Sequence, residues 1–167
     1  MSSELKSLQG WYNHFQQHSP TDVKSLCEKV GVVCEGKILS DNFSGYIERL
    51  SEFKYKIVYN LMHPDVRQRF TIAHELGHFY LHRDILGKGT GDTKAYRSDV
   101  PGHKNKNITN IHEREANSFA ADLLMPRKNI IKLKAEGKTF EDIQAILDVS
   151  PQALEFRLRN LGIDLNN

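Results

Sequence analysis

The chain has 167 residues, the length of one compact domain, of which 39% are hydrophobic and 26% are charged. This balance excludes a disordered polar chain, and the formal net charge of +2 is too small to indicate nucleic-acid binding by itself. The first residues lack the basic start and apolar stretch of a signal peptide, and no window approaches the roughly 20 apolar residues of a transmembrane helix. We therefore predict a cytoplasmic protein without a membrane segment.

The first half of the chain predicts one short helix followed by strands. Residues 19–22 are typical of a helix start, apolar residues follow at helical spacing, and Gly31 ends the helix. Residues 32–39 are predicted to be extended, and a second strand begins at Gly45. Apolar and polar residues alternate over 53–61, which is the period-2 pattern of a half-buried strand. We expect these strands to form a small antiparallel sheet.

The second half is predicted to be mainly helical, which gives an α+β fold. A long helix begins at residues 63–65, where proline is tolerated in the first turn, and runs through Leu81. Glycines and one proline then punctuate a polar loop over residues 83–107, and a loop of that length often has a function. The later helices are expected at residues 110–125, 139–147 and 150–161.

The chain contains two cysteines, Cys27 and Cys34, which lie seven residues apart among valines. Two thiols in this setting favour free buried cysteines over a disulfide framework. We expect both thiols to be reduced.

The long predicted helix carries the pattern H-E-x-x-H at His74, Glu75 and His78. Two histidines four residues apart lie about 40° apart around a helix axis, so their ring nitrogens can converge on one ion. A glutamate directly after the first histidine projects beside the metal, where it can take a proton from bound water. The alternative is a helix with two ordinary surface histidines, and a third ligand downstream would favour the metal site.

The third ligand is not expected from the same helix. His82 lies about 12 Å along the axis from His74, too far for one ion bonded to both. The metzincin pattern would require glycine at position 81 and histidine at position 84, where this chain has Leu81 and Asp84. A metzincin site is therefore disfavoured.

Two glutamates of the next helix compete for the role of third ligand. Glu113 lies on the face of the apolar stripe, whereas Glu115 lines up with Ser118 toward solvent. Glu113 is therefore the better ligand, although it could instead complete a capping box after Asn110. Asn117, one turn further on, is a candidate for holding a metal-bound side chain by a hydrogen bond.

These residues closely resemble the ImmA/IrrE family of metallopeptidases. The resemblance rests on two blocks, residues 67–78 and 113–126, and extends over roughly residues 20–163. It implies a gluzincin-like core with a small sheet over the active-site helix and zinc held by His74, His78 and Glu113. We expect a single domain, in which residues 1–130 form the zincin-like core, about 83–107 is an inserted loop, and a C-terminal helical pair within 131–167 packs on the core.

The expected chemistry is zinc-dependent hydrolysis of a peptide bond, with manganese as the alternative metal. Glu75 would act as the general base and later protonate the leaving amine. The oxyanion needs a donor, and Tyr96, Arg97 and His103 in the long loop are candidates by chemistry alone. By analogy with gluzincins, the alternating strand at 53–61 could be a sheet edge along which an extended peptide pairs.

The resemblance also implies a substrate class, because family members typically cleave or inactivate helix-turn-helix repressors, including regulators of toxin–antitoxin pairs. We expect a protein partner of this kind, and a toxin role is compatible with it. The alternative is a silent module that sequesters its partner without cutting it, against which the intact Glu75 counts. The loop at 83–106 could gate the cleft, dock a partner or simply be solvated.

Direct DNA binding is the weakest alternative. Residues 140–161 have a helix-turn-helix rhythm, and Arg157 and Arg159 lie in the second helix. Basic residues cluster poorly there, so this helical pair is expected to pack on the protease core rather than to bind DNA.

Overall fold

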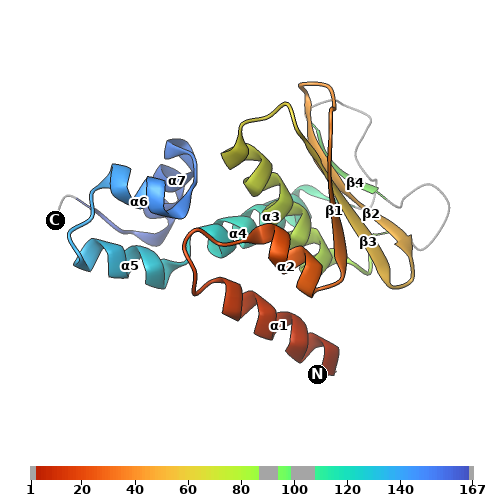
Figure 1. Cartoon of the computed structure of the whole chain (residues 1–167), viewed down its shortest axis with the longest axis horizontal. Coiled ribbons are helices and arrows are strands. Elements are labelled where there is room, and N and C mark those ends of the chain that lie inside the picture. The colour runs from red at the N-terminus through yellow and green to blue at the C-terminus, as the bar shows by residue number, and fades with distance from the viewer. Residues whose placement is uncertain (1–2, 87–93, 99–107, 166–167) are drawn as a thin grey trace.

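A computed structural model has an α+β fold and describes residues 3–86, 94–98 and 108–165 (Figure 1). Its helices are α1 (Ser3–Phe15), α2 (Val23–Lys29), α3 (Asp65–His82), α4 (Asn110–Leu124), α5 (Arg127–Ala135), α6 (Phe140–Leu147) and α7 (Pro151–Leu161). Its strands are β1 (Val32–Lys37), β2 (Phe43–Ser51), β3 (Lys54–Asn60) and β4 (Lys94–Ser98). Within these ranges, no helix combines the length and the apolar composition needed to cross a membrane.

The strands form one sheet in the order β1-β3-β2-β4. β2 pairs antiparallel with both β3 and β4, but β1 pairs parallel with β3. The α+β class is thus confirmed, while the expectation of a wholly antiparallel sheet is wrong for β1. The chain reverses between β1 and β2 and again at residues 52–53, so β3 runs in the direction of β1. Because β1 lies beside β3 rather than beside β2, their pairing is parallel.

The strand with the alternating pattern, β3, lies inside the sheet. β1 and β2 occupy its main-chain groups on both sides, so the prediction that a substrate peptide pairs along this strand is wrong. Both of its faces are covered in its second half, where Ile57 and Tyr59 are buried on one face and Val58 and Asn60 on the other. Asn60 is accommodated because its side chain bonds the backbone of the β1–β2 connection, with Nδ2 donating to Phe43 O at 2.9 Å and Oδ1 accepting from Leu39 N at 3.1 Å.

The segment predicted as a polar loop, residues 83–107, contains the edge strand β4. Its five residues include Lys94, Arg97 and Ser98, a polar run that does not predict a strand. The pairing with β2 therefore comes from tertiary context. Residues 87–93 and 99–107 of the predicted loop lie outside the described residues. His103 is one of them.

The core is built around α3, which contacts β2 and β3 on one side and α4 on the other (Figure 1). Its central residues from Thr71 to Phe79 are all buried. Gly77 allows the close approach of α3 and α4, because a Cβ at this position would lie 3.0 Å from Ala116 Cα and 3.1 Å from Ala116 O, so α4 would have to shift slightly. This close crossing brings the side chains of the two helices within reach of one another.

The free cysteines that the sequence indicates are confirmed within α2 and β1, where Cys27 is buried and Cys34 is half-buried. The hydrogen bond between the two thiols, together with burial, raises the pKa of Cys27, and the same bond lowers the pKa of Cys34. Both residues contribute to the packing of α2 on the sheet.

The N-terminal and C-terminal helices are joined to the core through α4. Tyr12 of α1 donates to Asp122 Oδ2 at 2.7 Å, and Arg157 of α7 donates to Met125 O at 2.9 Å and also contacts the Asp122 carboxylate. In addition, Arg69 of α3 pairs with Asp148 at 3.0 Å. Arg157 is thus turned toward the C-terminal end of α4.

Candidate metal centre

The H-E-x-x-H residues lie in the buried middle of α3. Asp65 begins this helix directly after Pro64, as the sequence indicates, and the helix continues to His82. The exposed fractions of His74, Glu75 and His78 are 1%, 0% and 1%. Such burial excludes the alternative of two ordinary surface histidines.

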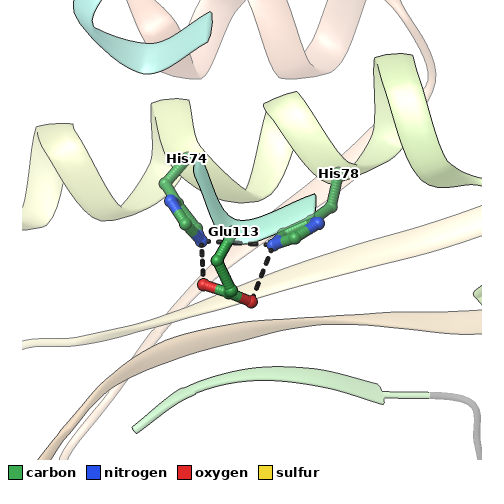
Figure 2. A group of neighbouring side chains, drawn as sticks. All are labelled: His74, His78 and Glu113. Atoms are coloured by element: carbon green, nitrogen blue, oxygen red, sulfur yellow. Dashed lines mark hydrogen bonds and ion pairs between the residues drawn. The ribbon is translucent and has the colours of Figure 1, made fainter. Parts of the chain in front are cut away.

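Glu113, in the first turn of α4, reaches both histidines (Figure 2). Its Oε2 lies 3.4 Å from His74 Nε2, and its Oε1 lies 3.5 Å from His78 Nε2. The two Nε2 atoms are themselves 3.2 Å apart. The structure therefore brings together the three residues selected as ligands in the sequence, in a cluster that we call the inner group.

The spacing of the inner group fits a tetrahedral metal ion. Bonds of about 2.0–2.2 Å to nitrogen and oxygen place the ligands of such an ion about 3.3–3.6 Å apart. The observed separations of 3.2–3.5 Å match this requirement almost without rearrangement. His74, His78 and Glu113 can therefore hold a metal ion.

Hydrogen bonds also present the correct ring atom of His74. Its Nδ1 lies 3.0 Å from Asn117 Oδ1, an acceptor, so Nδ1 carries the proton and Nε2 keeps its lone pair. Asn117 thus occupies the position expected of a residue that holds a metal-bound side chain.

His78 is oriented by a chain of two further side chains. His82 Nε2 lies 2.8 Å from the carboxylate of Glu115, which can only accept, so His82 carries its proton on Nε2. His82 Nδ1 then accepts from His78 Nδ1 at 3.1 Å, and His78 Nε2 keeps its lone pair for the inner group. Burial lowers the pKa of His82, against the opposing effect of Glu115, and favours the neutral ring that this chain requires.

The carboxyl of Glu113 is held in its ionised form. Burial is the largest single influence and raises its pKa, but the hydrogen bonds and charges of His74 and His78 outweigh it. The net result is a pKa well below the ordinary value for glutamate. Glu113 is therefore an anionic donor between two imidazoles, as a cation site requires.

The structure describes the other predicted site residues to different extents. Glu75 is fully buried in the same turn of α3 as the two histidines. The backbone of Tyr96 and Arg97 lies in β4, opposite Tyr46 and Gly45 of β2. His103 lies outside the described residues, so the oxyanion role of this segment stays a prediction.

Sequence reasoning gave no role to a second cluster, His82, His112 and Glu115, which we call the outer group. One donor atom from each residue lies within 4.8 Å of the others. The helix face of Glu115 predicts that it points to solvent, and its side chain is 52% exposed, but it also pairs with His82 across the α3–α4 contact. Helical spacing gave one signal, since His82 continues the i, i+4 row of His74 and His78.

The sequence model of peptidase family M78, described as an IrrE N-terminal-like domain, matches residues 35–159. The chain belongs to this family. The resemblance seen in the sequence is thereby confirmed, and the matched range runs from β1 to α7 and includes every residue of the inner and outer groups. No curated protein matches the chain. Membership in a metallopeptidase family and a His–His–Glu group able to hold an ion together support a metallopeptidase-type role.

Proposed function

We propose that this protein is a zinc-dependent endopeptidase that hydrolyses a peptide bond in a protein partner, with manganese as the alternative ion. The observation that carries the proposal is the inner group, in which two imidazole lone pairs and one carboxylate converge at tetrahedral spacing. Three protein ligands that leave a fourth position open are typical of catalytic rather than structural zinc sites.

In the proposed mechanism, some residues bind the metal ion and one transfers a proton. A zinc ion in this group would supply a Lewis acid that polarises a carbonyl and lowers the pKa of a water molecule toward about 7. His74 and His78 bind as neutral rings, held by Asn117 and His82. The Glu75 carboxylate takes the proton of the attacking water and passes it to the nitrogen of the leaving amine.

We place the extended substrate along β4 instead of β3. β4 is an edge strand of the sheet and contacts α3. In Figure 2 the imidazoles of His74 and His78 point from α3 toward the side on which this green strand lies. An edge strand offers free main-chain groups, so a peptide can add to the sheet there by β-augmentation.

A groove beside the inner group could hold a further part of the partner. It has a volume of about 880 Å³ and runs from Asn117 to α7, with Phe70, Met125 and Phe156 among its lining residues. Phe156 is 53% exposed, so its ring is accessible to a partner from solvent.

The partner we propose is a helix-turn-helix regulator or antitoxin, and this step rests on the family resemblance. The zinc-loaded protein is incubated with any helix-turn-helix regulator that is encoded in a neighbouring gene, and fragments are detected by intact mass. One defined cut is expected, absent in chelator. Glu75→Gln should retain zinc and reduce cleavage by about 10²–10⁴-fold, because a general base contributes that much.

The matched control is Glu141→Gln, which makes the same chemical change at an exposed position of α6 and should cleave normally. Full cleavage by a zinc-loaded Glu75→Gln protein would refute the proposed mechanism. A stable complex without any cut would instead support the sequestering module.

A further inference from the structure

The outer group has the composition of a transition-metal site. His82 ends α3, while His112 and Glu115 lie one turn apart on α4, and two imidazoles with a carboxylate suit zinc and its neighbours. These residues line an open groove of about 1090 Å³, so an ion can reach them from solvent. His82 and His112 lie with their ring centroids 4.7 Å apart.

We propose that the outer group, His82, His112 and Glu115, is an alternative site for a divalent zinc-like ion, and that the inner and outer groups share one ion between them. The reason lies in the contact between the two groups. His78 of the inner group and His82 of the outer group face each other through their Nδ1 atoms at 3.1 Å, and only one proton fits between them.

When the ion is in the inner group, the proton arrangement closes the outer group. His78 binds through Nε2, so its proton is on Nδ1 and is donated to His82 Nδ1. The proton of His82 is then on Nε2, where it bonds Glu115 at 2.8 Å. A protonated nitrogen has no lone pair, and His82 cannot bind an ion in this state.

When the ion is in the outer group, the same two protons are arranged the other way. His82 now binds through Nε2 and carries its proton on Nδ1, which donates to His78 Nδ1. The proton of His78 moves to Nε2, the atom that faces Glu113 at 3.5 Å. Each ring keeps one proton and stays neutral in both states. Moving the protons therefore leaves the net charge unchanged, but His78 can no longer act as a ligand.

The outer group is the weaker of the two sites. His112 Nδ1 accepts the backbone N–H of Thr109 at 3.2 Å, as the side-chain half of the capping box of α4. Its Nε2 therefore carries the proton, and binding an ion requires His112 to give up this cap. Glu115 is half-exposed, whereas Glu113 is mostly covered, so the outer ligands are also less fixed.

An ion in the outer group would leave the peptidase off, because His78 then offers a proton and not a lone pair to the inner group. This regulatory consequence rests on the proposed function. The alternative binding itself does not, and it can be tested without any substrate.

The experiment counts zinc ions by native mass spectrometry and measures affinity by competition with a chromogenic chelator, using Zn²⁺ alone. Four proteins are compared: wild type, His112→Gln, Glu113→Ala and the double variant. Glutamine is chosen because it can keep the cap on Thr109 at the third helical position. Circular dichroism of each metal-free protein checks the fold.

Wild type and His112→Gln should each bind one ion with similar affinity, since both use the inner group. Glu113→Ala should still bind one ion, but at least about 100-fold more weakly. Removing a residue that only hydrogen-bonds a ligand lowers metal affinity about 10–100-fold, and removing a direct ligand should lower it more. The double variant should bind at least about 10-fold more weakly again. His74→Leu, alone and combined with His112→Gln, tests the same point by removing a different ligand of the inner group.

Two results would overturn the proposal separately. Two ions bound together to the wild-type protein would disprove the shared ion. Equal affinities of Glu113→Ala with and without His112→Gln would disprove the outer site. Failure of the proposed peptidase function would be seen only in the cleavage assay and would leave both of these readings intact.

Discussion

The inner and outer groups contain the same residue types, two histidines and a glutamate, and both lie where α3 meets α4. They differ in where their protons are. Asn117 and His82 take the Nδ1 protons of the inner histidines and leave both Nε2 lone pairs facing Glu113. In the outer group, His82 donates to Glu115, and His112 caps the backbone of its own helix. Proximity and residue type thus do not decide which group binds the ion more tightly, because neighbouring side chains decide which nitrogen has a free lone pair.

The difference between the two groups is tested most directly by removing the carboxylate of each group in turn. Glu113→Gln should weaken zinc binding by at least about 100-fold, since it removes an anionic ligand that lies 3.4 and 3.5 Å from the two inner nitrogens. Glu115→Gln should weaken it by about 10-fold at most, because glutamine still offers an oxygen to His82 Nε2. Chelator competition measures both affinities.

The two substitutions are isosteric and lie on the same helix, so each controls for the other. Equal losses would show that the two groups act as one site. A larger loss for Glu115→Gln would reverse the assignment of inner and outer groups.

A smaller effect is expected from the hydrogen bond that orients His74. Asn117→Leu removes the acceptor 3.0 Å from Nδ1, and the ring is then free to carry its proton on Nε2, where it blocks the ion. Zinc affinity should fall about 10–100-fold, the usual effect of losing such a partner. Asn117→Asp keeps an acceptor oxygen and should retain zinc affinity, so unchanged binding by Asn117→Leu would show that the bond does not orient the ring.

How much of this site the sequence could predict depends on how local the geometry is. His74, Glu75 and His78 could be placed because helical spacing alone sets their relation. Glu113 could be selected over Glu115 because one face of α4 is apolar. The contact of Glu115 with His82 could not be predicted, since the two residues meet only through the packing of α3 on α4.

The fold shows the same limit. The helix at α3 and the strand at β3 follow from periodicity in the chain. The pattern of β3 does not reveal that the strand is central, because Asn60 reads as an exposed polar residue. Its amide is instead buried and bonded to the backbone near Leu39 and Phe43, and these partners are set by tertiary structure. For β4, a polar run becomes a strand only by pairing with β2.

The smallest predicted effect concerns what the two groups share, which is the close crossing of α3 and α4. Gly77→Ala places a methyl group 3.0 Å from the backbone of Ala116, which cannot swing aside. Overpacking costs about 1–3 kcal/mol and better helix propensity returns about 1 kcal/mol, so the free energy of unfolding should fall by up to about 2 kcal/mol. Gly10→Ala makes the same change in α1, where nothing lies within 4 Å of the new atom, and should stabilise by up to about 1 kcal/mol. Urea denaturation of the metal-free proteins measures both, because bound zinc would add its own stabilisation.

Since the displaced α4 carries Glu113 as well as Glu115, zinc affinity of Gly77→Ala should also fall. Full affinity with lowered stability would instead show that the inner group adjusts independently of the helix crossing.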